Sequence, residues 1–519
     1  MLNTVFCDRR NTLSRFAAVL VFVLFISSTI VSQSFRGKIL GTITDQNGAV
    51  IQGATVVARN VGTGIERTTI TDADGNYSIS ELPIGTYEVK ASAKNFQAGT
   101  LGGVIVEVAA DRRADVILGT TVGSVSVDVL AEEQVETSST TLGGTIQTRA
   151  VADLPVNGRD FTKFLVLVPG ASGDPSGATD SPGSFGLFSA NGNRGRSNNY
   201  LIDGTDMNDG YRNLPAINEA GVFGTPATIL PLEGIQEVAV LSNFEAEYGR
   251  NSGSVVNIVT KSGTNNFHGA LFEFFRNDKT DARNFFNFKP DAKTHLNNNQ
   301  FGGSLGGPIV KNKTFFYVNY EGQRERVGLN STARIPDPRE IQATLEGHPC
   351  GGGGDRFGGI ILNPVIGRLL ALNPWGTPNH PLPVCDDSGD PNLFVTTPAS
   401  NDVDSFIGKI DHSFNDHNQI TGRYYYGSSD QSFPLAILGG NILPGYNTVT
   451  PTRVDLVSIS YLKIFSSTKV NEVRFGYNRF DQGFFPEDQA FDPHSIGLNN
   501  GTTNSRDFGL PLGFRKIRI

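Results

Sequence analysis

The 519-residue chain has little charge, one tryptophan and three cysteines, and each shortage narrows the class of protein. Charged residues make up 18% of the chain and no long run carries one sign, so nothing favours a nucleic-acid binder, which needs a basic patch. After residue 30 no stretch approaches the roughly 18 apolar residues of a membrane-spanning helix. If the protein lies in a membrane, it therefore crosses it as a barrel of strands.

Two of the three cysteines, Cys350 and Cys385, lie in one Gly- and Pro-rich segment. In an exported chain, two cysteines in one loop predict a single disulfide, with two free thiols as the alternative. Their spacing fits neither a zinc site nor a CxxC redox pair. No metal, cofactor or catalytic site is predicted: the seven histidines are scattered, and no GxSxG nucleophile motif is present.

The N-terminus has the pattern of an export signal. Three arginines precede the apolar run at 16–30, which is too short to span a bilayer comfortably. Small residues favour cleavage directly after Ser34, so residues 1–34 are predicted to be a signal peptide. An uncleaved N-terminal anchor helix is the alternative.

Glycine and phenylalanine are the abundant residues, with 60 and 35 copies, and there are 26 prolines. This composition favours a fold that is dominated by β-structure and turns over a helical one. A chain of this length exceeds one ordinary core, so two or more domains are expected.

Residues 38–118 predict a small β-sandwich of about seven short strands separated by Asn-Gly, Asp-Gly and Pro-Ile-Gly turns. Tyr87, Val89 and Ala91 alternate with polar residues, so they are expected on a buried face. The stretch DADGN at 72–76 also suggests a calcium loop, but its twelfth position is Pro83 instead of Glu. A tight hairpin turn is the better prediction, because Asp-Gly supplies the positive φ angles that such a turn needs.

The stretches GTITDQNGAVIQGATV and TDADGNYSISELPIGTYEV resemble the carboxypeptidase regulatory-like domain, a transthyretin-type sandwich. The resemblance implies an appendage without peptidase chemistry, and no HxxE zinc pair suggests otherwise. The stretches that follow resemble the plug of a TonB-dependent outer-membrane transporter of the Oar-like branch. They appear in the family's order, and the similarity runs from residue 38 to at least 330; the segments are LPVNGRDF, NYLIDGTDMND and PLEGIQEVAVLSNFEAEYGRNSGSVVNIVTKSGTNNFHG.

This resemblance implies an α+β plug at 134–263 and, at 266–519, the first part of a transmembrane barrel. Within the plug, two strands are expected at 236–241 and 254–260. The plug residues that we expect to face a ligand, each equally compatible with a structural role, are Arg194, Arg196, Asp203, Asp206 and Arg212.

The extended segment 124–131 lies where the family keeps its TonB box, the strand that pairs with a periplasmic energy-transducing protein of the TonB type. The physical basis is β-augmentation, in which a strand offers its backbone groups to the edge of a partner's sheet. A plain linker strand is the alternative. The candidate residues are Val125, Ser126, Val127, Asp128 and Val129.

From residue 267 onward, apolar and polar residues alternate with a period of two. In 314–323, for example, every second residue from Phe316 is apolar, and the alternate series between them ends in the polar residues Glu321 and Gln323. This alternation predicts antiparallel strands of an outer-membrane barrel, with the aromatic face toward lipid. The alternate residues that include Phe272 and Phe274 are likewise expected to face lipid. A large soluble sandwich or propeller alternates too, but it gives no reason for a plug in front of it.

About seven barrel strands are expected between 266 and 481, with a short turn at 415–418 and a long external loop at 325–401 that holds both cysteines. Transporters of this type have about 22 strands. The sequence therefore predicts an incomplete barrel and a fragment of a longer protein.

The resemblance implies energy-dependent uptake of an extracellular ligand across the outer membrane, with no bond chemistry. Adhesion or protein export by an Oar-type surface barrel is the alternative function, and an enzyme ranks last. Siderophores, glycans and peptides all remain open as ligands, and the sandwich gives a hint of carbohydrate binding.

Overall fold

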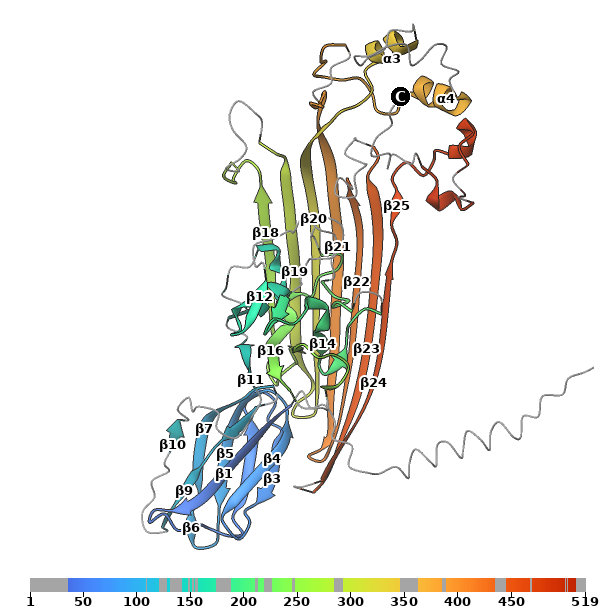
Figure 1. Ribbon diagram of the computed structural model, residues 1–519. Coiled ribbons are helices and arrows are strands. Elements are labelled where there is room, and N and C mark those ends of the chain that lie inside the picture. The colour runs from blue at the N-terminus through green and yellow to red at the C-terminus, as the bar shows by residue number, and fades with distance from the viewer. Residues whose placement is uncertain are drawn as a thin grey trace, which may run out of the picture.

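The computed structural model describes residues 36–509, arranged as a sandwich, a plug and a curved wall of long strands (Figure 1). The predicted signal peptide, both cysteines, Arg212 and residues 125–127 lie outside the described residues. The other residues left out between 36 and 509 are 109, 121–124, 131–141, 148–149, 152–153, 155–156, 174–187, 211, 219–225, 245–247, 284–292, 346–349, 351–362, 386–388, 435–444, 467–468, 500 and 502.

The sandwich packs two sheets face to face, in the strand orders β4-β1-β9-β6, with β8 beside β1, and β10-β7-β5-β2-β3. Its core contains Tyr87, Val89 and Ala91, as their alternation with polar residues predicts. The strands are β1 (Gly37–Asp45), β2 (Thr55–Asn60), β3 (Glu66–Ile70), β4 (Asn76–Leu82), β5 (Gly85–Ser92), β6 (Phe96–Gln97), β7 (Gly99–Val106), β8 (Asp111–Arg113), β9 (Val116–Thr120) and β10 (Asp128–Leu130).

The DADGN stretch forms a tight turn. The Asp72 carboxylate accepts from the backbone N–H groups of Asp74 and Asn76 at 3.0 and 2.8 Å, and Gly75 has a φ of 71°. The turn is not a hairpin, however, because β3 and β4 belong to different sheets. The sequence predicted the turn chemistry correctly and its partners wrongly, since local residues do not specify which sheet a strand joins.

The plug is built on one five-stranded sheet in the order β11-β16-β17-β14-β15, in which β14 and β17 run parallel. Its two central strands lie where they were expected. The strands and 3-10 helices are β11 (Leu142–Gln147), η1 (Asn157–Arg159), η2 (Phe161–Leu167), β12 (Ala171–Gly173), β13 (Phe188–Ala190), η3 (Gly195–Ser197), β14 (Asn199–Ile202), β15 (Thr205–Asp206), η4 (Leu232–Gly234), β16 (Ile235–Asn243) and β17 (Val255–Thr260).

The wall is an antiparallel meander of seven long strands, the number that the sequence predicts, and the described sheet ends at β18 and β24 without closing. A short strand, β25 (Phe485–Pro486), adds to β23. The long strands are β18 (His268–Asn277), β19 (Leu296–Val310), β20 (Thr314–Ala333), β21 (Leu393–Asn415), β22 (Asn418–Phe433), β23 (Thr448–Ser466) and β24 (Lys469–Gln482).

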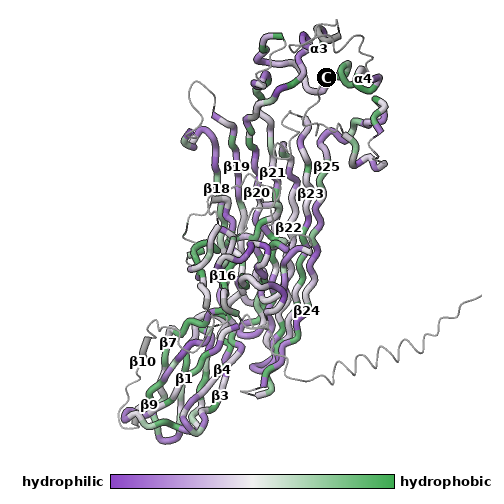
Figure 2. The backbone as a smooth tube through the Cα atoms, in the orientation of Figure 1, coloured by the Kyte–Doolittle hydropathy of each residue, from purple (hydrophilic) through white to green (hydrophobic). Residues whose placement is uncertain are grey.

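Residues alternate in hydropathy along the strands of the wall (Figure 2). Because successive side chains of a strand point to opposite faces, the two faces of the wall differ in polarity. The convex face exposes an apolar band that includes Leu271, Ile410, Ile459 and Phe475. At one end this band stops at a row of arginine–aspartate pairs, as a lipid-facing band stops at the polar boundary of a membrane. The pairs are Arg324–Asp404, Arg326–Asp402, Arg453–Asp455 and Arg479–Asp481.

Two expectations about the wall are wrong. The series of Phe272 and Phe274 faces the plug, because the guanidinium of Arg159 lies 4.4 and 4.6 Å from their ring centroids. The loop predicted at 325–401 is shorter, because β20 continues to Ala333 and β21 begins at Leu393. Beyond the apolar band a strand needs no apolar face, so alternating hydropathy cannot locate its end.

A cap follows the wall at the end where the arginine–aspartate row lies. Its helices are α3 (Pro338–Leu345), α4 (Pro364–Leu372), η7 (Pro493–Ile496) and η8 (Ser505–Asp507). Ile335, Leu369, Trp375, Leu393 and Ile496 form a separate small core there. No described helix has the length and apolar character to cross a membrane.

The sandwich is joined to both other units. The side-chain amide of Asn265 donates to the carbonyl of Thr63 at 2.7 Å, and Arg36 donates to Gln419 of the wall at 2.9 Å. On the plug side, Glu237 is 3% exposed and accepts from the backbone N–H of Val108 at 2.8 Å. Burial, with the neighbouring Glu107 carboxylate, raises the pKa of Glu237 to about 7.

We expect this sandwich–plug joint to weaken as pH rises. Because the joint holds the pKa of Glu237 above its ordinary value near 4.5, the contact is most stable below that value and loses stability as pH rises through about 7. The loss is at most about 3 kcal/mol. Glu237→Gln keeps the acceptor oxygen and removes the charge. Hydrogen exchange at Val108, compared between variant and parent at each pH, should show equal protection at pH 5 and stronger protection in the variant at pH 8.

Glu107→Gln is the matched control, because Glu107 faces the same joint but already pairs with Arg112 at 2.9 Å. Because burial is the largest cause of the raised Glu237 pKa and Glu107 a smaller one, this variant should keep most of the pH dependence. Equal exchange of Glu237→Gln and the parent at pH 8 would contradict the assignment.

Candidate functional site

The contact between plug and wall is built around one buried carboxylate, Asp203. It begins the Asp203-Gly204 turn between β14 and β15, where both residues have positive φ, as a two-residue hairpin of this type requires. Its carboxylate lies 2.9 Å from the guanidinium of Arg423 and 3.7 Å from the ammonium of Lys409. It also accepts from the backbone and hydroxyl of Thr260, at 2.9 and 2.6 Å.

The electrostatics of Asp203 favour the charged form. Burial by itself raises the pKa of this carboxyl, but Lys409, Arg423 and the Thr260 hydrogen bonds together outweigh burial, and the pKa lies below its ordinary value. Two wall strands, β21 and β22, supply the cations, and the plug supplies the anion. The plug is therefore tied to the wall by a buried ion cluster, which we call the Asp203 anchor.

A second anchor lies at the other side of the plug. Arg159 of η1 donates from Nε to Glu321 of β20 at 3.1 Å, and Gln300 of β19 donates to the same carboxylate oxygen at 2.9 Å. Glu233 lies 3.7 Å from Arg159 and 4.0 Å from Lys261. Because Glu321 is fully buried, Arg159 supplies the charge that compensates it.

Apolar packing joins the same two units. Tyr317, Ile407, Tyr425, Val454 and Leu456 of the wall share one buried cluster with the plug core. The hydroxyls of Tyr317 and Tyr425 each donate to a plug carbonyl, that of Glu233 at 2.5 Å and that of Ile229 at 2.9 Å. The plug therefore rests on the wall through a mixed surface in which tyrosines carry both apolar and polar contacts.

A pocket of about 1010 Å³ lies between the β15 edge of the plug and β24. It combines both charge signs, amides and an aromatic ring, a lining suited to a polar ligand with many hydrogen-bonding groups. The side chains on its plug side are Thr205, Asp206, Asn208, Asp209 and Arg250, and the inward series of β24 adds Arg474, Asn478 and Phe480; Tyr477 and Arg479 of β24 border the pocket from the outward series.

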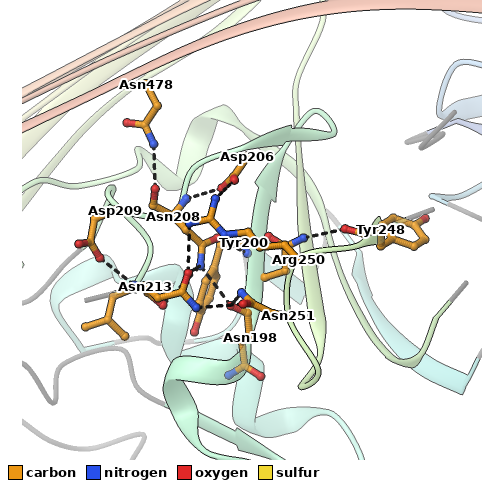
Figure 3. Close-up of polar contacts among 12 residues, drawn as sticks. Asn198, Tyr200, Asp206, Asn208, Asp209, Asn213, Tyr248, Arg250, Asn251 and Asn478 are labelled. Carbon is orange, nitrogen blue, oxygen red and sulfur yellow. Dashed lines mark hydrogen bonds and ion pairs between the residues drawn. The ribbon is translucent and has the colours of Figure 1, made fainter. Parts of the chain in front are cut away.

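An asparagine network fixes the plug side of this pocket (Figure 3). Asn208 accepts from the backbone N–H of Tyr200 at 2.7 Å and donates to the carbonyl of Asn198 at 3.1 Å. Asn251 donates to that same carbonyl at 2.7 Å. Asn478 of β24 donates to the carbonyl of Asn208 at 3.1 Å and so connects the network to the wall.

The structure places the expected ligand-facing residues in different settings. Asp206 lines the pocket and pairs with Arg250, whereas Asp203 is buried in the plug–wall contact. Arg194 and Arg196 are exposed on and beside η3, and the Arg196 carbonyl accepts from Asn213 of the network at 2.6 Å. Only Asp206 among the described four therefore lies in the pocket lining.

Of the predicted coupling segment, the described residues are 128–130. They form β10, which pairs in parallel with β7 of the sandwich instead of standing alone. The rest of the TonB-box candidate lies outside the described residues.

Comparison with known proteins identifies two domains, one near the N-terminus and one in the second half of the chain. Residues 38–119 match the carboxypeptidase regulatory-like domain, and residues 259–516 match the outer membrane beta barrel domain. Over 313 residues the chain is 29% identical to the TonB-dependent transporter Oar of Myxococcus xanthus, an alignment that covers 57% of this chain and 27% of that protein. The chain joins a carboxypeptidase regulatory-like domain to an outer membrane beta barrel domain and is similar to an Oar-type TonB-dependent transporter.

Two further proteins are similar to this Oar-like chain. Over 200 residues, 37% of the chain and 24% of the relative, it is 28% identical to the probable TonB-dependent siderophore receptor PirA of Acinetobacter baumannii. The outer membrane transporter YddB of Escherichia coli superimposes with a TM-score of 0.42 at 12% identity, covering 66% of this chain and 39% of that one. The chain spans about a quarter of the length of the curated relatives it matches. The Oar-like chain is an outer-membrane protein.

The sequence missed most of the contacts that hold the Oar-like plug. Arg423 and Lys409 are separated from Asp203 by more than 200 residues, and each occupies an ordinary polar position of an alternating strand. One available signal was that both lie on the polar, inward series of β21 and β22. A charged side chain on that series is enclosed between wall and plug, away from bulk water, so it needs a compensating partner on the plug.

Removing the Asp203 charge should loosen the plug. Asp203→Asn leaves Arg423 and Lys409 buried without their counter-ion, which we expect to destabilise the plug–wall contact by about 3–5 kcal/mol. The urea concentration at which plug strands lose hydrogen-exchange protection measures this effect. Asp206→Asn is the matched control: its pair with Arg250 is about 40% exposed, so it should cost about 1 kcal/mol or less. Equal midpoints for the two variants would show that Asp203 is no anchor.

Proposed function

We propose that the Oar-like chain is the N-terminal part of a receptor that takes up a polar extracellular ligand across the outer membrane, driven by a TonB-type partner in the periplasm. The observation that carries the proposal is a plug tied to the lumenal face of the wall by two ion clusters, with a pocket at its edge. Beside these clusters the wall adds five residues to the shared apolar cluster, so the contact mixes charged and apolar groups instead of resting on apolar surface alone. A plug held in this way can be displaced and can return.

The coupling step runs through the segment 124–131. The partner binds this segment by strand addition and pulls it, the plug shifts against the wall, and the ligand passes inward. No bond is made or broken in the ligand. The predicted signal peptide at 1–34 directs export of the chain across the inner membrane.

The pocket lining supports a hydroxyl-rich ligand such as a carbohydrate. Asp206, Asp209 and the asparagines offer acceptors, Arg250 and Arg474 offer donors, and Phe480 offers an apolar ring surface. A ferric siderophore is the competing ligand class, because one relative is named a probable siderophore receptor. A panel of labelled maltooligosaccharides, oligopeptides and a ferric catecholate siderophore separates these classes.

A second function, surface adhesion or protein export, is favoured by the cap. Its helices carry a small core of their own, so the cap is a folded surface that a partner outside the cell can contact. If the chain acts in adhesion, deleting the TonB-type partner should leave binding at the cell surface unchanged. If it acts in uptake, the same deletion should abolish uptake.

Breaking the coupling strand tests energy-dependent uptake. Val127→Pro removes a backbone donor from the segment and should reduce uptake of the active panel compound to the level of cells without the partner. Ser138→Pro, placed in sequence between that segment and β11, is the matched control and should keep uptake. Full uptake by Val127→Pro would exclude this segment as the coupling strand.

Filling the pocket tests the ligand site. Asn478→Trp puts a large ring into the pocket and should lower uptake at least tenfold, with the protein still in the outer membrane. Val473→Trp lies on the lipid-facing series of the same strand, 60% exposed, and should have little effect. Equal uptake by the two variants would place the ligand elsewhere.

A further inference from the structure

The described part of the predicted coupling segment is already in a sheet. Residues Asp128, Val129 and Leu130 form β10 and pair in parallel with Thr100, Leu101 and Gly102 of β7. Figure 1 shows β10 along the flank of the sandwich, beside β7. The sandwich therefore holds this segment extended before any other protein arrives.

The outer edge of β10 is available. The sheet order β10-β7-β5-β2-β3 puts β10 at the end, and among the described residues no strand pairs with its other side. An edge strand presents a row of unpaired backbone N–H and C=O groups, which is the template for strand addition by another chain.

We propose that the sandwich presents β10 as a ready-formed docking edge for a strand of the energy-transducing partner, so that the partner's strand continues the sandwich sheet. This inference rests on the proposed function, and it assigns the appendage domain a role in coupling. A strand that is held extended loses less conformational freedom on binding than a free linker, so the complex is tighter for the same contacts.

The position of β10 in the chain supports this role. Residues 131–141 join it directly to β11, the edge strand of the plug sheet, and Figure 1 shows β11 at the end of the plug that lies nearest the sandwich. Within the plug sheet β11 pairs only with β16. A pull on β10 therefore reaches first a strand that has a single neighbour.

An alternative arrangement has the opposite consequence. If β7 hides the coupling strand instead of presenting it, the partner must strip β10 from β7 before it binds. Presentation and hiding differ in what happens when β10 is locked to β7.

A disulfide that reversibly locks β10 to β7 distinguishes presentation of the strand from its hiding. Thr100→Cys with Asp128→Cys places cysteines at paired positions of β7 and β10, within reach of a disulfide. Ile105→Cys with Asp128→Cys is the control pair, on the same strand of the sandwich but outside the paired register. The readouts are disulfide formation in the purified chain, with Cys350 and Cys385 retained, and its affinity for the periplasmic domain of the host's TonB-type protein, oxidised and reduced.

We expect the paired cysteines to cross-link and the control cysteines to stay reduced, with the locked protein binding the partner domain within about threefold of the parent. A tenfold or greater loss of affinity on locking, restored by reductant, would mean that β7 hides the strand and would overturn the inference. Failure of the paired cysteines to cross-link would also overturn it. If uptake by the parent protein does not depend on the partner, the proposed function is wrong. That outcome is distinct from the outcome of the cross-linking test.

Discussion

The polar inner face of the wall is the constraint on which the rest of the structure depends. In a membrane barrel, alternate side chains of each strand face lipid and the others face the lumen. In this chain the lumenal series includes Arg423, Lys409 and Glu321, which are buried. A charge buried on that face is costly unless another group compensates it. The plug meets this need, because it brings Asp203 to the two cations and Arg159 to Glu321. The wall and the plug are therefore complementary parts of one electrostatic arrangement.

The compensation is incomplete, and this suits a plug that moves. Several buried polar atoms of the described plug–wall contact have no hydrogen-bond partner: both side-chain polar atoms of Asn319, Oε2 of Glu321, Oε1 of Gln323, and Nε and Nη2 of Arg423. Each unmade hydrogen bond of this kind costs roughly 1–3 kcal/mol. An interface with such orphaned groups is less stable than a fully satisfied one, so smaller forces displace it.

Much of the wall could be predicted from the sequence, because period-two alternation is local and lipid enforces it. The number of wall strands and the core positions of the sandwich follow from that pattern. The exceptions have physical causes. Phe272 and Phe274 face inward because Arg159 packs on their rings, and no local pattern reveals an arginine more than 100 residues earlier in the chain.

The site was less predictable, because its parts come together only in three dimensions. The sequence named Asp203 and Asp206 together, yet they lie three positions apart on one hairpin, and Asp203 enters the wall contact whereas Asp206 lines the pocket. Glu237 is one of many surface-type residues in the sequence, and only the docking of the sandwich buries it. Residues of one motif can thus have separate roles, whereas residues far apart can share one.

The plug sheet places the two proposed activities at opposite edges. β15, at one edge, carries Thr205 and Asp206 of the ligand pocket, and β11, at the other edge, leads to the coupling strand. β11 contributes Ile146 to the shared core, whereas β16 and β17 each contribute several buried residues. A pull that enters at β11 therefore removes a weakly held edge first and leaves the Asp203 anchor, which lies beside β15, for a later step. Under the proposed function, this order opens the plug next to the sandwich first, while the pocket is still held against the wall.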